Sequence, residues 1–135
     1  MPLGAGRVYN EAANDLVVFT FGNGVPMALR AARAIEKEHG WQVRVIDLRW
    51  LAPLNDAFIA AQAKNAKRIL VLDEGRKSAG VGEGIITAVV EAGCGATPMK
   101  RVVGADTFTP LAGAALLVLP GEAEIVAAAR QLAAH

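Results

Sequence analysis

The architecture of this chain follows from Ile69-Leu-Val-Leu-Asp-Glu-Gly-Arg-Lys-Ser-Ala-Gly-Val-Gly-Glu-Gly-Ile-Ile86. Its first four residues are apolar, which predicts a strand buried on both faces, because a strand covered by helices on both sides cannot alternate polar and apolar side chains. Gly75 permits a positive φ, and Gly80 and Gly82 allow one backbone to approach another closely. The stretch therefore predicts a buried strand, a turn and a helix that begins among glycines.

Segments typical of strands and of helices alternate on both sides of this stretch. Strands are predicted at 16–21, 42–48, 68–72 and 99–103, and helices at 27–38, 55–65, 81–92 and 122–134. Such alternation implies right-handed crossovers, so we expect an α/β domain with three αβα layers and a mostly parallel sheet of about five strands. Residues 1–14 lack sustained periodicity and are predicted to be a linker from an upstream domain, with the domain itself at 15–135. Residues 106–121 are expected to be irregular.

The composition is that of an apolar globular chain. Of its 135 residues 53% are hydrophobic and 20% are charged, and the 14 basic side chains are balanced by 13 acidic ones without a basic block. This argues against nucleic acid or a membrane as partner, and the apolar runs fall short of a membrane span. Cys94 is the single cysteine, so no internal disulfide forms, and the first residues lack the apolar core of a signal peptide. A cytoplasmic location and a protein partner are expected.

Two glycine turns resemble nucleotide-binding motifs without the residues that bind a nucleotide. The turn at Gly22-Asn-Gly24 stands between a strand and a helix, but Met27 occupies the place of the third glycine of a dinucleotide-binding turn. The segment Gly75-Arg-Lys-Ser-Ala-Gly80 has the outer glycine spacing of a Walker loop, but Val81 follows where that loop has lysine. Both segments are therefore predicted to be structural turns.

Charged side chains beside these turns are the remaining candidates for a site. Arg76 and Lys77 lie next to a helix start whose amides could accept an anion, which makes them a candidate anion contact. Asp47, Asp73 and Glu74 lie near the carboxyl ends of two strands, where open α/β sheets bind ligands. They could serve acid–base chemistry, but no Ser, Cys or His nearby completes a catalytic set, and acceptance of hydrogen bonds from turn amides is the favoured reading.

The residue types that usually bind metals or stack on ligands are isolated. His39 and His135 are far apart and have no second His or Cys at ligand spacing. Cys94 is expected to be an ordinary small residue of a turn, and Trp41 and Trp50 to be packing anchors. We therefore assign no catalytic, cofactor-binding or metal-binding residue to the chain.

Six segments carry a family resemblance: Pro2-Leu-Gly-Ala-Gly-Arg-Val8, Asp15-Leu-Val-Val-Phe-Thr-Phe-Gly22, Val45-Ile-Asp-Leu-Arg49, Leu51-Ala-Pro-Leu54, Glu74-Gly75 with Gly80-Val-Gly82, and Met99-Lys-Arg-Val-Val-Gly104. Together they resemble the C-terminal domain of the transketolase family, in the form found in the beta subunits of thiamine-diphosphate-dependent 2-oxo-acid dehydrogenases of the pyruvate and branched-chain type. The chain departs from the family pattern at Ala79, where a second glycine is usual. Residues 107–121 also lack the commoner aromatic and acidic closing loop.

The resemblance implies an assembly role. In such enzymes two preceding domains hold thiamine diphosphate and magnesium, so this chain is expected to bind no cofactor and to be inactive alone, as part of a parent that oxidatively decarboxylates a 2-oxo acid. The implied partners are the upstream thiamine-binding domains or subunit, a second beta-type subunit in a homo-oligomer, and the acyltransferase core. On this reading Gly22, Gly75, Gly80 and Gly82 make room for a neighbour, and Glu74 fixes the turn that presents them.

Two other functions remain open from the sequence. The first is the C-terminal domain of a transketolase-like transferase, which shares the same motifs. The second is a free-standing α/β module that binds a small molecule or nucleotide, which the acidic strand ends and glycine turns motivate.

Overall fold

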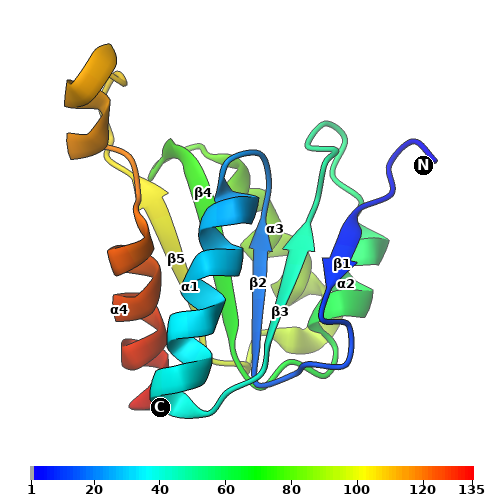
Figure 1. Ribbon diagram of the computed structural model, residues 1–135. Helices are drawn as coiled ribbons and strands as arrows, with labels where there is room; N and C mark the ends of the chain where they lie inside the picture. The colour runs from blue at the N-terminus through cyan, green and yellow to red at the C-terminus, as the bar shows by residue number, and fades with distance from the viewer. Residues whose placement is uncertain (1) are drawn as a thin grey trace.

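The computed structural model describes residues 2–135, so Met1 of the predicted linker lies outside the described residues. The elements in chain order are β1 (Arg7–Tyr9), β2 (Leu16–Thr20), α1 (Gly24–His39), β3 (Val43–Asp47), α2 (Asp56–Ala63), β4 (Ile69–Arg76), α3 (Val81–Val89), the π-helical turn η1 (Val90–Cys94), β5 (Met99–Gly104), the 3-10 helix η2 (Ala112–Leu117) and α4 (Glu122–Ala133). The strands form a five-stranded sheet in the order β1-β3-β2-β4-β5. Helices α1 and α4 cover one face and α2 and α3 the other (Figure 1). The predicted three-layer α/β domain is confirmed.

The order in which the chain adds strands to the sheet switches from one side of β2 to the other. Strands β2, β3, β4 and β5 are parallel, and β1 is antiparallel to β3. The chain passes from β2 to β3 on one side, then returns across β2 to β4 on the other. The carboxyl ends of β2 and β4 therefore lie together where open α/β sheets commonly bind ligands.

The core consists of one apolar layer on each face of the sheet. Leu16 and Val18 of β2 belong to the layer beneath α1 and α4, whereas Val17 and Phe19 belong to the layer beneath α2 and α3. All four side chains are buried. Because successive side chains point to opposite faces, a strand covered on both faces is apolar at every position, as the sequence predicted.

The first strand places part of residues 1–14, which were predicted to be a linker from an upstream domain, in the sheet. Arg7–Tyr9 is too short for a periodic pattern to show, but it pairs with the edge of β3 through the partners Arg7 and Asp47, Val8 and Ile46, and Tyr9 and Val45. This pairing satisfies backbone donors and acceptors that the edge of β3 would otherwise present to solvent.

The sequence signals for the end of α1 and for the start of α2 are confirmed. Gly40 follows α1 in the left-handed conformation, with φ of 68°, and its amide donates to the carbonyl of Glu36. Asn55 caps α2 by accepting a hydrogen bond from the amide of Phe58 at 2.9 Å. Helix α3 ends at Val89, before the predicted 92, because the chain continues as a π-helical turn around Gly93, whose φ is 81°.

Residues 107–117, which we call the arm, leave the end of β5 and stand away from the sheet (Figure 1). The arm has the irregular course that was predicted, apart from the 3-10 helix Ala112–Leu117, which contains no buried residue. The stretch Ala112–Ala133 is long and apolar enough to cross a membrane by length and composition, with 22 residues and a mean hydropathy of 1.5 over an 18-residue window. It is two helices, however, and the second, α4, buries an apolar face against α1 and β5.

Candidate functional site

Asp73 organises the turn that follows β4. Its side chain is only 1% exposed, and it lies on the same face of the strand as Val71, toward α3. One carboxylate oxygen, Oδ1, accepts a hydrogen bond from the amide of Gly75 at 2.7 Å, and Oδ2 accepts one from the amide of Gly82 at 2.7 Å. Asp73, and not Glu74 as the sequence analysis expected, therefore fixes this turn. The interpretation of these acids as acceptors for turn amides is right for Asp73.

The glycines of this turn are explained by contacts within the chain. A Cβ atom at Gly75 would lie 2.8 Å from Oδ1 of Asp73, and one at Gly80 would lie 2.6 Å from the carbonyl oxygen of Arg76. A Cβ atom at Gly82 would lie 3.2 Å from Oδ2 of Asp73. These glycines therefore make room for this chain's own carboxylate and backbone, and the expected neighbouring subunit is not needed to explain them.

Positive φ angles occur in this region at positions that the sequence analysis did not expect. Gly75 does not adopt one, whereas Ala79 has φ of 55°. A non-glycine residue is strained in that conformation. This is a physical reason to expect glycine at position 79, as the family resemblance did. Gly22 in the turn after β2 does adopt a positive φ, of 54°.

A β-bulge places Glu74 and Gly75 outside the regular ladder. Asp73 pairs with Val103, and the next pair is Arg76 with Gly104, so β4 runs beyond the predicted end at Leu72. Asp73 precedes the bulge, so the regular alternation along β4 directs its side chain to α3, and the bulge lets the strand resume its pairing with β5 at Arg76. A Cβ atom at Gly104 would lie 2.9 Å from the carbonyl oxygen of Gly75. Gly104 is thus a structural glycine of this site, and its position at the end of a predicted strand was the only signal for it.

Glu74 is half-buried beside Asp73. Burial raises the pKa of its carboxyl group, and the negative charge of Asp73 raises that pKa further. The folded state therefore disfavours the charged form of Glu74. A carboxyl group with a raised pKa is one feature of a general acid, but it carries no catalytic role without a reacting partner in reach.

The carboxylates at the strand ends do not form a pair. Asp47 lies on β3 and shares a face with Val45, toward α1, whereas Asp73 lies on β4 and faces α3. Strand β2 separates the two strands. Instead, Oδ2 of Asp47 accepts a hydrogen bond from Nε of Arg49 at 3.0 Å. Two carboxylates on opposite faces cannot share a substrate proton, so the geometry does not support acid–base chemistry by this pair.

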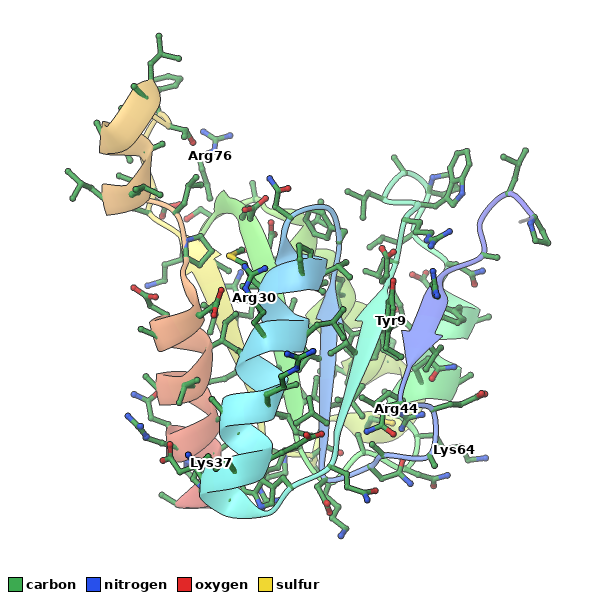
Figure 2. All side chains as sticks on the ribbon, viewed as in Figure 1. Tyr9, Arg30, Lys37, Arg44, Lys64 and Arg76 are labelled. Carbon is green, nitrogen blue, oxygen red and sulfur yellow. The ribbon has the colours of Figure 1, made fainter. Side chains whose placement is uncertain are left out.

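The amides at the start of α3 are already engaged. The amide of Gly82 donates to Asp73, and the amide of Ala79 donates to Oε2 of Glu83 at 2.9 Å. An anion held beside Arg76 would have to displace these carboxylates from the helix start. Figure 2 shows Arg76 at the carboxyl edge of the sheet, close to the base of the arm.

Arg76 and Lys77 act on Asp106 at the base of the arm. Hydrogen bonds from the hydroxyl and the amide of Ser78 lower the pKa of Asp106, and the positive charges of Lys77 and Arg76 lower it further. The hydroxyl of Ser78 lies 2.7 Å from Oδ2 of Asp106, and its amide 2.8 Å from Oδ1. The basic pair therefore supports the link between the turn after β4 and the start of the arm.

The described residues do not fit a metal–diphosphate group. Within residues 2–135 no cluster of three or more His, Cys, Asp or Glu is arranged to hold a metal ion. The buried carboxylate of Asp73 has both oxygens committed to backbone amides. We therefore derive no cofactor-dependent step from this chain.

The tryptophans and the cysteine, which the sequence analysis treated as isolated residue types, differ in how far they are buried. Trp41 stacks on His39 with ring centroids 4.6 Å apart, and the guanidinium of Arg68 lies 4.1 Å from the centroid of the Trp41 ring. The prediction that Trp41 is a packing anchor is confirmed, but Trp50 is 40% exposed and is not one. Cys94 is a half-buried free thiol in η1, at the turn where it was expected.

Arg44 is a buried charge that the sequence analysis missed. Its Nη2 donates to Oδ1 of Asn14 at 2.6 Å, and its Nη1 donates to Oε1 of Gln62 at 3.1 Å. Burial lowers the pKa of this guanidinium. Figure 2 shows it near Lys64, away from the carboxyl edge. An arginine inside the apolar run of β3 was the available signal, and its role is to tie α2 and the chain before β2 to the sheet.

The sequence and the fold of the chain match those of known proteins. Residues 4–133 match the family model described as transketolase, C-terminal domain. The chain belongs to the transketolase C-terminal domain family. The predicted resemblance is thus confirmed over nearly the whole chain, and the match includes β1, which lies inside the predicted linker.

Curated relatives of this transketolase C-terminal domain are beta subunits of 2-oxo-acid dehydrogenases. The chain is 38% identical over 122 residues to the 3-methyl-2-oxobutanoate dehydrogenase subunit beta of Mycobacterium tuberculosis, a match that covers 89% of this chain and 35% of the relative. It is 32% identical over 131 residues to the pyruvate dehydrogenase E1 component subunit beta of Staphylococcus aureus, which covers 96% of this chain and 40% of the relative. The chain therefore spans less than half of either relative.

A solved structure confirms the fold of this transketolase C-terminal domain. A chain described as a split gene transketolase, inactive beta4 tetramer, aligns with a TM-score of 0.80 and 25% sequence identity. The alignment covers 98% of this chain and 42% of that one. Like the two beta subunits, this neighbour is longer than the region that the chain shares with it.

Proposed function

We propose that this chain is the assembly domain of the beta subunit of a thiamine-diphosphate-dependent 2-oxo-acid dehydrogenase, an enzyme that oxidatively decarboxylates a 2-oxo acid. The proposal rests on the sequence matches to two dehydrogenase beta subunits, which cover 89% and 96% of this chain. On this proposal, thiamine diphosphate and magnesium bind to the rest of the parent enzyme, and the isolated chain is inactive.

The geometry of the turn after β4 supports this division of labour. A domain that binds a diphosphate or a metal needs unengaged amides or carboxylates at its site, but here Asp73 and the amides of Gly75 and Gly82 satisfy one another. The same observation removes the main support for a free-standing nucleotide-binding module. A transketolase-like parent is less favoured because the transketolase neighbour is 25% identical, against 38% and 32% for the dehydrogenase subunits.

The proposed partners are other subunits of the parent enzyme. Association of beta-type chains with one another is supported by the structural neighbour, which is described as a beta4 tetramer. The remaining parts of the beta subunit, and the acyltransferase core, complete the proposed set. A cytoplasmic location is part of the proposal, with the free thiol of Cys94 as its support.

A chimeric subunit tests the assembly role. The transketolase C-terminal region of the Mycobacterium tuberculosis beta subunit is replaced by residues 4–133 of this chain, and the product is combined with its natural partner subunit. We expect sedimentation to show the normal oligomer, and the complex to retain decarboxylation of 3-methyl-2-oxobutanoate. A chimera that is folded by circular dichroism but does not assemble would contradict the proposal.

Calorimetry of the 135-residue chain tests the absence of a cofactor site. Titration with thiamine diphosphate and magnesium is expected to give no binding heat. The titration of the assembled chimera, which contains the other domains, is the positive control. Saturable binding by the chain alone would show that it carries a cofactor site and is more than an assembly domain.

A further inference from the structure

Strand β5 forms one edge of the sheet, next to α4 (Figure 1). Among the described residues it pairs with β4 alone. The amide of Ile69 in β4 donates to the carbonyl of Pro98 at 2.9 Å, which fixes the phase of the ladder. Because alternate residues of a strand direct their backbone groups to opposite sides, the amides and carbonyls of Met99, Arg101 and Val103 face away from β4.

The chain itself uses this edge just beyond β5. The amide of Ala105, the next residue in the same alternation, donates to the carbonyl of Val118 at 2.9 Å. Within residues 2–135, the outward backbone groups of the preceding residues in that alternation have no such partner. An open row of amides and carbonyls is a template for a further strand. The edge of β5 can therefore accept a strand from another chain.

A groove lies beside this edge, between β5 and α4. Its volume is about 420 Å³. Its apolar lining comes from Val102 and Val103 of the strand and from Ala127 and Ala128 of the helix. Because alanine side chains are short, α4 leaves room there for the side chains of an added strand. Recognition by strand addition uses both features, since backbone hydrogen bonds provide affinity and pockets for alternate side chains provide specificity.

The charged side chains around the groove are mainly basic. Lys77, Lys100 and Arg101 contribute positive charge. Among the described residues that line the groove, Glu124 is the only acidic one. Lys100 donates to the neutral side chain of Gln131, and neither Lys77 nor Lys100 forms an ion pair within the described part of the chain. The groove therefore has uncompensated positive charge and is complementary to an acidic segment.

We propose that an extended acidic segment of a partner protein binds in this groove and adds to β5 as a sixth strand. Its backbone pairs with Met99, Arg101 and Val103, which engages about five of its residues. Its acidic side chains lie near Lys77 and Lys100, and its small apolar side chains lie against the valines and alanines of the groove. The inference goes beyond the proposed assembly role and does not depend on it.

A second copy of β5 is a poor occupant of this edge. Two β5 strands paired antiparallel about Arg101, the register that uses all the outward residues, would place the two Arg101 side chains opposite each other, with Lys100 of each copy nearby. Like charges directly opposite in a sheet are destabilising, and lysine on an edge strand opposes pairing with a like strand. The same charges that exclude a like strand select an acidic one.

Titration of the isotope-labelled chain with a designed peptide tests the inference by NMR. The probe is acetyl-Asp-Val-Glu-Val-Asp-Val-amide, which is acidic and favours an extended conformation. One control peptide has lysine at the acidic positions, and a second keeps the acidic sequence but has a methyl group on every backbone nitrogen. With the acidic probe we expect saturable shifts of the amides of Met99, Arg101 and Val103. Both controls should bind about tenfold more weakly or worse, because the first is repelled and the second lacks backbone donors.

Matched variants locate the site. Lys100→Glu reverses a charge in the groove, and Lys64→Glu makes the same change in net charge at the end of α2, away from β5 (Figure 2). Val103→Pro removes one outward donor without removing a donor to β4. We expect Lys100→Glu and Val103→Pro to weaken binding of the acidic probe about tenfold, and Lys64→Glu to leave it unchanged. Melting temperatures report whether each variant is folded. Both lysines are exposed, so their comparison decides the matter even if the proline variant unfolds.

Four outcomes would overturn the inference. The first is no saturable shift with the acidic probe at millimolar concentration. The second is equal binding of the methylated peptide, which would identify charge attraction without strand addition. The third is an equal effect of Lys64→Glu and Lys100→Glu. The fourth is a wild-type chain that associates with itself in sedimentation and loses this association in Val103→Pro, which would assign the edge to a second copy.

Discussion

The turn after β4 and the arm after β5 leave neighbouring strands at the same edge of the sheet, but the turn pairs its polar groups within the chain, whereas the arm exposes apolar side chains. The turn is rich in glycine and polar groups, and Asp73 satisfies two of its amides inside the chain. The arm is apolar, and its four largest side chains are at least 80% exposed. The glycine-rich turn therefore makes its contacts within the chain, whereas the arm, which has no recognisable motif, leaves its apolar side chains uncovered.

The physical reason lies in what each segment must hide. A buried polar group is costly unless it is paired, and the turn provides its own pairs. Apolar surface can be hidden only by more apolar surface, and the arm does not fold back on the sheet. Interface residues are therefore better sought in the arm than among the glycines.

The largest expected effect separates the two regions by removing the carboxylate of the turn. Asp73→Ala leaves the buried amide of Gly82 and the part-buried amide of Gly75 without acceptors, and we expect it to lower the free energy of unfolding by about 3 kcal/mol. Chemical denaturation measures the loss. Asp73→Asn, which keeps one acceptor oxygen, is the control and should cost less. A loss below about 1 kcal/mol for the alanine variant would show that water or another group satisfies these amides.

The same substitution in both regions gives the next largest effect. Gly80→Ala puts a Cβ atom 2.6 Å from the carbonyl oxygen of Arg76, whereas a Cβ atom at Gly113 in the arm meets nothing within 4 Å. We expect Gly80→Ala to cost about 2 kcal/mol of folding stability and Gly113→Ala to change it by less than about 0.5 kcal/mol. Thermal denaturation of the two variants checks this. Equal effects would contradict the assignment of the turn as the close-packed region.

These contacts also change the expectation for Gly82. The sequence-based interpretation implied that Gly82→Val would weaken association more than folding. Gly82 is buried, and its Cβ position lies 3.2 Å from Oδ2 of Asp73 and 3.4 Å from a methyl carbon of Val71. The substitution is now expected to act on folding.

A smaller effect is expected from relieving backbone strain in the turn. Ala79→Gly should raise the free energy of unfolding by up to about 1 kcal/mol, because Ala79 has a positive φ that glycine adopts without penalty. The reverse change, Gly22→Ala, should lower stability by a similar amount, because Gly22 also has a positive φ and a Cβ atom there meets nothing within 4 Å. Denaturation midpoints measure both. A destabilising Ala79→Gly would mean that the side chain of Ala79 makes a contact that outweighs its strain.

The smallest expected effect is the pH dependence caused by Glu74. Burial and the charge of Asp73 raise the pKa of Glu74 in the folded state. The folded state therefore holds this proton more tightly than the unfolded state does, and stability falls as pH rises from the ordinary value near 4.5 through the raised folded value. Glu74→Gln should remove this decline and be more stable than wild type at neutral pH, with no such advantage below the ordinary pKa. Parallel unfolding profiles for the two proteins across this range would contradict the assignment.

Much of the fold could be predicted because it depends on short-range patterns. Four consecutive apolar residues identified the centre of β4, Gly40 identified the end of α1, and Asn55 identified the start of α2. These signals act through neighbours in the sequence or through alternation along one strand. The strand at Arg7–Tyr9 could not be predicted in the same way, because it is stabilised by pairing with β3 some 36 to 40 positions away.

The site could be predicted only in part. The sequence located the turn, the acidic pair and the glycines. It also led to two predictions that the structure does not support: that Glu74 fixes the turn, and that Gly80 and Gly82 make room for a neighbouring subunit. The choice between Asp73 and Glu74 depends on which side chain faces α3, and the register of β4 in the sheet decides that, because alternate side chains of the strand point to that face.

The sequence by itself determined that this is a three-layer α/β domain of the transketolase C-terminal kind, since strand and helix patterns and family motifs are properties of contiguous segments. The tertiary structure alone decided that the glycines close on Asp73 and that the arm is left exposed. Both depend on distances between residues that are not neighbours in the sequence, such as Asp73 and Gly82, which are 9 positions apart, or Ser78 and Asp106, which are 28 positions apart. A linear pattern contains the chemistry of those groups but not their separation in space.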